Sequence, residues 1–176
     1  MLFRSNNKTW PDDYPYSLAR DWDVPYRYER IIALLKEAPA SAERFERIQT
    51  DTLDTYALDL KRRLMRAAPF SSASAPLAAS IEAWDGRMDR ARPEPLIWAA
   101  WARALSRRIY ADELGRNFEN YWSYRADLIL RALDDTDGQS RWCDDKTTPQ
   151  TEDCASRIRL ALEDRSEEHT SELQSR

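Results

Sequence analysis

The sequence contains few of the residues from which common catalytic and nucleotide-binding motifs are built. Only three of its 176 residues are glycine, which excludes a phosphate-binding loop and the dinucleotide-binding fingerprint. The single histidine, His169, lies in the stretch 165–176, so the body of the chain has no histidine base for a Ser-His-Asp or Cys-His set. No apolar run approaches the roughly 20 residues that cross a bilayer, since PLIWAAWARAL is broken by Arg103. We therefore expect no membrane span and no histidine-based hydrolase.

The overall composition is that of a folded domain. Apolar residues make up 42% of the chain and charged residues 33%, with seven tryptophans and eight tyrosines. So many aromatic residues argue against disorder, and the length is sufficient for one domain with a core. The formal net charge of −4 gives no reason to expect nucleic acid or an anionic membrane as a partner.

Helical spacing dominates after Val24. Pro25 fits the first turn of a helix that stops before Pro39, and Ser41 fits the N-cap of the next one. Gly86 fits a helix end. We find no convincing strand and no internal repeat, so the pattern predicts an all-α segment of about six amphipathic helices. The longest apolar stripe is expected in one helix, and it comprises Phe45, Ile48, Thr52, Tyr56, Leu60 and Leu64. Other stripes comprise Leu77, Ile81 and Trp84; Ile97, Trp101, Leu105 and Ile109; and Phe118, Tyr121, Trp122, Arg125, Leu128 and Ile129.

The C-terminal string RSEEHTSELQSR, residues 165–176, resembles a common sequencing adapter translated in one frame. We expect it to be an artefactual, disordered or frayed tail outside the fold. An ordinary solvated terminus is the alternative, and neither interpretation gives His169 a role. The artefact interpretation predicts that the natural gene continued past Asp164, so that this chain is a fragment. The last helix is expected from Glu152 to about Glu163.

The segment FRSNNKTWPDDYP, residues 3–15, is a stiff polar loop that carries Asn6 and Asn7. Asparagine is a common turn residue, because its amide bonds to nearby backbone and it tolerates left-handed conformations. The functional alternative is an amide donor held on a rigid loop and aimed at a developing oxyanion. Spacing alone favours the turn.

Arg27 is expected in the first turn of a helix, where a cation is electrostatically unfavourable. An arginine in such a place often binds a neighbouring carboxylate or carbonyl oxygen. Arg27 is therefore either a structural anchor or part of a site.

Cys143 and Cys154 flank the segment DDKTTPQTED. Without a CxxC pair or a nearby histidine, they make a poor zinc site. A disulfide that closes a short loop fits their placement best and indicates an oxidising compartment, with two free thiols as the alternative. The acidic pairs at 12–13, 134–135 and 144–145 are interpreted as solvated turns, and Trp84, Trp98, Trp101 and Trp122 as core residues.

Several short pieces of the sequence, taken in order over residues 4–164, resemble the β chain of the penicillin amidase family of N-terminal-nucleophile hydrolases. The family includes penicillin acylases and acyl-homoserine-lactone acylases. The pieces are Asn6-Asn7, Asp13-Tyr14-Pro15, Arg27 with Arg30-Ile31, Gln49-x-Asp51-Thr52 and Trp84-Asp85-Gly86. The stretch from Trp142 to Cys154 also resembles some bacterial members.

The resemblance implies an enzyme that needs no histidine. A precursor cuts itself into α and β chains, and the new β-chain terminus is a serine whose hydroxyl attacks and whose α-amine acts as base. An asparagine stabilises the oxyanion, and an arginine orients that asparagine and the terminal amine. The resemblance places these two catalytic-site roles on Asn6 and Arg27. The implied substrate is a small acyl amide, of the penicillin or acyl-homoserine-lactone type.

The resemblance also implies what lies outside this sequence. The serine nucleophile would precede Met1, and the α chain and the remainder of the β chain, with the sheets of an αββα sandwich, would be partners. This segment alone is therefore expected to be inactive. We expect an active-site loop at 1–23, a helical section at 24–164 and the tail at 165–176.

The parent is expected to be periplasmic or secreted. No cofactor or metal is expected within this segment, although family members often bind a structural calcium, mostly through other parts of the chain. Asp21 is the one weak candidate ligand here. The competing hypotheses are a non-enzymatic helical interaction module, in which Asn6 only forms a turn and Arg27 is a surface anchor, and a periplasmic binding partner stabilised by the disulfide.

Overall fold

The computed structural model describes residues 6–19, 22–37, 39–121 and 125–174, with the backbone alone for residue 121 and residues 165–174. Within these ranges the chain forms eight α-helices and no strand, and only two isolated β-bridges occur. The all-α prediction is confirmed, although the count of about six helices was too low. The helices are α1 (Tyr26–Lys36), α2 (Ala42–Gln49), α3 (Thr55–Leu64), α4 (Ala75–Ala83), α5 (Glu94–Leu114), α6 (Phe118–Tyr121), α7 (Ala126–Leu133) and α8 (Cys154–Gln174). Short 3₁₀ segments are η1 (Met65–Ala67), η2 (Gly115–Asn117) and η3 (Thr136–Cys143).

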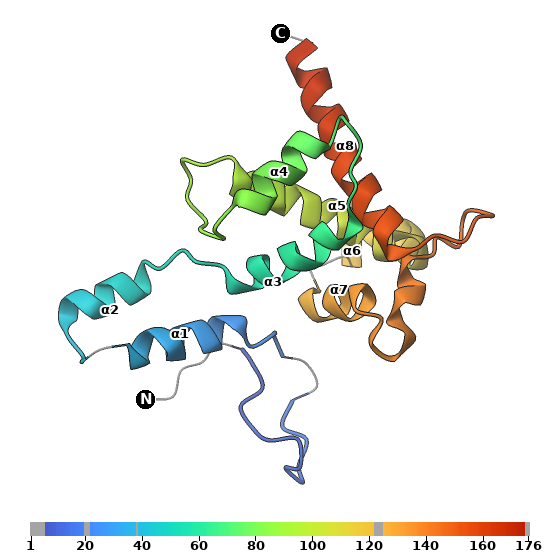
Figure 1. Ribbon diagram of the computed structural model, residues 1–176. Coiled ribbons are helices and arrows are strands. Elements are labelled where there is room, and N and C mark those ends of the chain that lie inside the picture. The colour runs from blue at the N-terminus through green and yellow to red at the C-terminus, as the bar shows by residue number, and fades with distance from the viewer. Residues whose placement is uncertain (1–5, 20–21, 38, 122–124, 175–176) are drawn as a thin grey trace.

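Helix α5 lies at the centre of the molecule, and α3, α4, α7 and α8 surround it (Figure 1). The most extensive packing joins α5 to α8. Trp101 on α5 is fully buried, and its indole Nε1 donates to the Ile158 carbonyl of α8 at 3.0 Å. The other large, fully buried side chains are Leu60, Leu64, Ile81, Trp84, Leu105, Ile109, Ile129 and Leu162. The predicted apolar stripes of α3, α4 and α5 therefore form one core.

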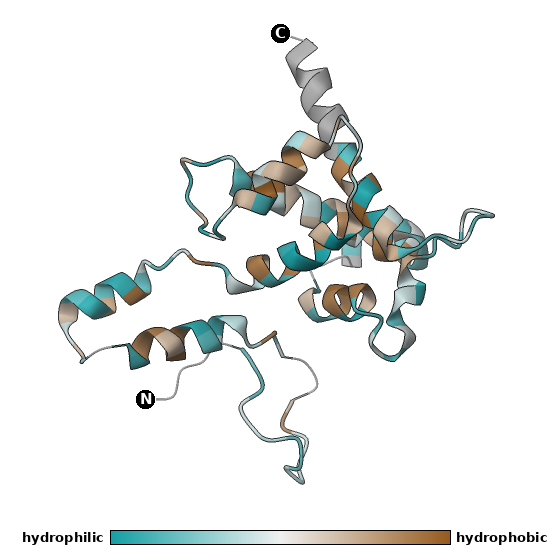
Figure 2. Cartoon of the chain, in the orientation of Figure 1, coloured by the Kyte–Doolittle hydropathy of each residue, from teal (hydrophilic) through white to brown (hydrophobic). Residues whose placement is uncertain are grey.

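The α1–α2 region, residues 26–49, lies to one side of this core (Figure 1). Helix α1 has no buried residue, although the brown segments in Figure 2 mark hydrophobic residues along it. The preceding loop exposes aromatic residues as well, with Tyr16 69% exposed and Trp22 46% exposed. Hydrophobic burial therefore contributes less to holding α1 than it does for the core helices.

The long helix predicted from Phe45 to Leu64 is wrong, because the chain leaves helical geometry between α2 and α3. Asp54 N-caps α3 by accepting from the Ala57 amide at 2.8 Å, a strong helix-start signal that the apolar stripe concealed. Phe45 is 44% exposed instead of buried. The predicted N-cap of α2 is confirmed, because Ser41 accepts from the Arg44 amide at 3.2 Å.

The C-terminal half also differs from the predicted helices. Arg125 was expected within a helix that continued from Phe118, but its φ of −105° and ψ of 84° make it the non-helical N-cap of α7. Trp122, which was expected in the core, lies outside the described residues. The backbone of α8 continues to Gln174, past the expected end near Glu163, because residues 164–174 contain no proline or glycine to stop it. The adapter origin of residues 165–176 stays a prediction.

A disulfide joins Cys143 at the end of η3 to Cys154 at the start of α8, as predicted. Arg157, whose side chain is 5% exposed, lies beneath the loop that this bond closes. Its Nε donates to the Cys143 carbonyl at 2.8 Å. Its Nη2 lies 3.1 Å from Glu152 and 3.3 Å from Asp145. The N–H groups on Nη2 are not aligned for a hydrogen bond to either carboxylate. Arg157 therefore holds the two acidic ends of the loop mainly by charge.

Among the residues described, no helix is both long and apolar enough to cross a bilayer.

Candidate functional site

The polar loop that carries Asn6 is closed at its base. The Asp23 amide donates to the Asn6 carbonyl at 2.8 Å, and Asn7 and Asp23 form a parallel bridge. Asn6 has a φ of +62°, a left-handed conformation that costs most residues about 1–2 kcal/mol but that asparagine adopts more readily. Asn6 is thus a turn residue, as the local pattern suggested.

The Asn6 side chain is also held by a partner distant in the sequence. Arg27, in the first turn of α1, donates from Nη2 to Asn6 Oδ1 at 2.7 Å, and both side chains lie in the exposed part of the surface. A guanidinium has only donors, so this contact fixes the oxygen end of the amide toward Arg27. The NH₂ end of Asn6 is therefore left to donate to another group. Asn7 differs, because its Nδ2 donates to the Lys8 carbonyl at 2.9 Å.

A second arginine of α1 makes a bidentate ion pair. Arg30 Nε and Nη2 donate to the two carboxylate oxygens of Asp51 at 2.7 and 3.1 Å. These hydrogen bonds lower the pKa of Asp51 despite its partial burial. Arg30 and Asp51 belong to separate pieces of the sequence pattern, and the structure brings the two pieces together.

The segment that carries Asp51 pairs in turn with the segment after Trp84. The Met88 amide donates to the Thr52 carbonyl, and the Asp54 amide to the Gly86 carbonyl, each at 2.9 Å. Trp84 is buried, and its Nε1 donates to the Arg87 carbonyl at 3.0 Å. A continuous set of contacts therefore links the loop, α1, the α2–α3 connection and the residues after α4.

Gly86 is required where these segments meet. Its φ is +82°, and a Cβ atom there would lie 2.6 Å from Leu58 Cγ. We expect Gly86→Ala to lower the free energy of unfolding by about 2–3 kcal/mol, because backbone strain and steric overlap add. Gly138→Ala is the matched control, since Gly138 has a φ of +72° with nothing within 4 Å and should cost only the strain of about 1 kcal/mol. Urea denaturation of both variants tests this, and equal losses would contradict the steric argument.

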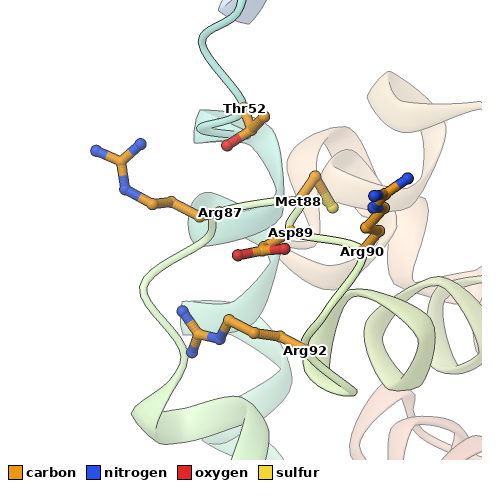
Figure 3. Close-up of a pocket in the computed structure, with 6 residues that line it drawn as sticks. All are labelled: Thr52, Arg87, Met88, Asp89, Arg90 and Arg92. Atoms are coloured by element: carbon orange, nitrogen blue, oxygen red, sulfur yellow. The ribbon is translucent and has the colours of Figure 1, made fainter.

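An open pocket of about 400 Å³ lies beside this region. Its lining residues are Thr52, Arg87, Met88, Asp89, Arg90 and Arg92. Figure 3 shows that the three guanidinium groups point in different directions. Arg92 also pairs with Asp85 at 2.8 Å and Glu94 at 3.2 Å. The arginines do not converge on one position, so the pocket does not define an anion site.

The described residues do not form a metal site by themselves. No group of three or more histidine, cysteine, aspartate or glutamate residues in the described ranges could hold a metal ion. Asp21, the weak sequence candidate, lies outside those ranges. Two acidic residues of the sequence pairs are instead bound to cations. Asp134 pairs with Arg63 and Arg66, about 70 residues earlier in the chain, and Asp12 pairs with Lys8, four residues earlier.

Sequence reasoning missed two residues that connect α1 to the core. The Tyr26 hydroxyl donates to Asp59 on α3, and the Tyr26 ring lies edge-on to Tyr56, with centroids 5.4 Å apart. Nothing in the local sequence links Tyr26 to a residue 33 positions away, so no signal pointed to this pair.

Comparison with known proteins shows the family to which this helical segment belongs. Residues 1–176 match the penicillin amidase family, and the chain belongs to that family, as the resemblance indicated. Penicillin acylase 2 proenzyme of a Pseudomonas species is 35% identical over 113 residues, which cover 63% of this chain and 15% of that protein. Acyl-homoserine lactone acylase QuiP of Pseudomonas putida is 24% identical over 174 residues, which cover 85% of this chain and 21% of that protein. The QuiP protein of Pseudomonas fluorescens is 26% identical over 181 residues.

The chain therefore spans between 15% and 21% of the length of these curated relatives.

Proposed function

We propose that this chain is the helical section of the β chain of an amidohydrolase that cleaves an acyl group from an amide. The observation that carries the proposal is the hydrogen bond from Arg27 Nη2 to Asn6 Oδ1 in a member of the penicillin amidase family. A structural anchor in a non-catalytic module would make the same contact, so it is the family membership that makes this pair an oxyanion donor and its support. The αββα sandwich, the α chain and the remainder of the β chain belong to the proposed parent protein.

In the proposed reaction a serine outside this sequence attacks the substrate carbonyl. Its own α-amine takes the hydroxyl proton and returns it to the leaving amine, and water then hydrolyses the acyl-enzyme. Asn6 acts as a catalytic residue by donating its amide N–H to the oxyanion of each tetrahedral intermediate. Because this donor is already oriented before the reaction, little reorganisation is needed when the charge develops.

Arg27 acts as a positioning residue with an electrostatic effect. Its contact with Oδ1 holds the amide plane and draws electron density toward the oxygen, which makes the N–H group a stronger donor. The left-handed backbone of Asn6 and the Asp23 amide fix the other end of the residue. The asparagine is therefore held at both its backbone and its side chain.

The test is alanine substitution in the full-length protein that carries this segment. We expect Asn6→Ala to lower kcat by roughly 10²–10³ with a small change in KM, as for loss of one oxyanion donor. Asn7→Ala is the matched control, because the neighbouring amide points to its own loop, and it should stay close to the unaltered enzyme. Release of the chromophore from 6-nitro-3-phenylacetamidobenzoic acid and hydrolysis of an acyl-homoserine lactone are the two assays. Unchanged turnover by Asn6→Ala in both would favour the interaction module.

The 176-residue chain alone serves as a further control in these assays. We expect no turnover from it, because it carries no N-terminal serine nucleophile. Activity that persisted through purification would contradict the assignment of the nucleophile to another part of the protein.

The two assays also address the acyl amide that is cleaved. One group of relatives is named for penicillin and the other for acyl-homoserine lactones, and both names describe acylases.

We propose a periplasmic or secreted location, which the Cys143–Cys154 disulfide supports.

A further inference from the structure

Arg27 cannot be held in place by its own burial. It lies in the exposed part of α1, and the contact described for its side chain is the hydrogen bond to Asn6. Its position therefore depends on the contacts that fix helix α1 against the rest of the molecule. Since α1 contains no buried residue, these are specific polar contacts more than a packed apolar face.

Two polar contacts reach from α1 toward the core, and they lie on one side of the helix. Tyr26 and Arg30 are four residues apart and so share a face, whereas Arg27 lies about 100° further around the helix. Tyr26 donates to Asp59 on α3, and Arg30 binds Asp51 in the α2–α3 connection. When Tyr26 and Arg30 bind the core, the rotation of α1 about its axis is fixed, and Arg27 is directed toward the loop that carries Asn6.

Tyr26 is adjacent to Arg27 in the sequence, and its acceptor Asp59 is itself held by an ion pair with Arg63. Arg63 lies 2.8 Å from Asp59 and 2.6 Å from Asp134, which follows α7. Burial raises the pKa of Asp59, but hydrogen bonds from Tyr26, Arg62 and Arg63 outweigh burial and lower it to about 2. Asp59 is thus a carboxylate acceptor at any working pH, and the Tyr26 ring adds a contact with the buried Tyr56.

We propose that Tyr26 is a positioning residue of this site, whose hydroxyl, donated to Asp59, orients the first turn of α1 and through it the Arg27–Asn6 pair. The inference rests on the proposed function, because it assigns Tyr26 a role in aligning the oxyanion donor. Misplacement of a catalytic group by about 1 Å can cost on the order of 10² in rate. A hydroxyl that touches no substrate can therefore affect turnover.

The test compares two conservative substitutions in the full-length protein. Tyr26→Phe removes the hydroxyl and keeps the ring on Tyr56, and we expect kcat to fall roughly 10- to 100-fold while KM changes little. Tyr28→Phe, the same change on an exposed residue of the same helix, should leave kcat within about twofold. Asp59→Asn weakens the same bond from α3 and should lower kcat in the same direction.

Combining substitutions separates this inference from the proposed function. If Tyr26 acts through the asparagine, Tyr26→Phe should cause no further loss of kcat in the Asn6→Ala background. Equal losses in both backgrounds, or a Tyr26→Phe enzyme that matches Tyr28→Phe, would overturn the inference and leave the proposed function intact. If Asn6→Ala itself retains full turnover, the proposed function fails instead.

Discussion

Replacing Trp101 with alanine is expected to lower the free energy of unfolding by about 3–5 kcal/mol. The indole is fully buried between α5 and α8, donates to the Ile158 carbonyl and meets the Phe70 ring edge-on at 5.8 Å. Alanine would leave a cavity at the most extensive helix contact of the fold. Because small domains are stable by only about 5–15 kcal/mol, the variant should be close to unfolding, as urea denaturation followed by far-UV circular dichroism would show.

Trp22→Ala is the matched control for this substitution. Trp22 is 46% exposed and contacts Trp10 edge-on at 5.8 Å, so its loss should cost about 1 kcal/mol or less. Trp101→Phe keeps a ring but loses the indole donor, and its loss in unfolding free energy should lie between those of Trp101→Ala and Trp22→Ala. Equal losses for Trp101→Ala and Trp22→Ala would contradict the assignment of the core to the α5–α8 contact.

Replacing Arg157 with methionine is expected to cost about 3 kcal/mol, because the substitution leaves carboxylates without their buried counter-charge. Asp145 and Glu152 keep partial access to water, with 26% and 18% of their side chains exposed. The loss in unfolding free energy should therefore lie at the lower end of the range found when a buried ion pair is broken. The Cys143 carbonyl also loses its donor. Thermal and urea denaturation under oxidising conditions would measure the change with the disulfide intact.

Two further variants show whether charge is the cause. Arg116→Met makes the same change at an exposed position of η2 and should alter stability by about 0.5 kcal/mol or less. Adding Glu152→Gln to Arg157→Met removes one unpaired carboxylate and should recover part of the loss. Failure to recover any of it would indicate that Arg157 contributes by packing and by its bond to Cys143.

Periodicity predicted the parts of the fold in which burial decides the structure. Tyr56, Leu60 and Leu64 on α3, and Trp101, Leu105 and Ile109 on α5, are buried as their spacing indicated. The stripe failed where it was continued back to Phe45, because the polar contacts of Asp51 and Asp54 break the helix there. Apolar spacing shows only which residues face the core. It carries no information on the Asp54 N-cap, which is a local polar signal, or on the ion pair of Asp51 with Arg30, which lies 21 residues away.

In the candidate site, too, the contacts between residues far apart in the sequence could not be predicted from local patterns. Asn6 and Arg27 were found through resemblance, and their 21-residue separation has no local pattern that could pair them. Tyr26 and Asp59 were missed because a tyrosine in a first helical turn and an aspartate on a second helix are each unremarkable alone. Only the folded arrangement shows that they meet.

Closure of the loop at its base has a consequence for how such proteins differ from one another. The Asn6 carbonyl and the Asp23 amide tie the two ends together, so the residues between them do not set the distance from Asn6 to α1. Insertions and deletions at the tip of a closed loop are thermodynamically inexpensive. We therefore expect relatives to tolerate length changes at the tip of this loop at little cost in stability, provided that the contact between the Asn6 carbonyl and the Asp23 amide is kept.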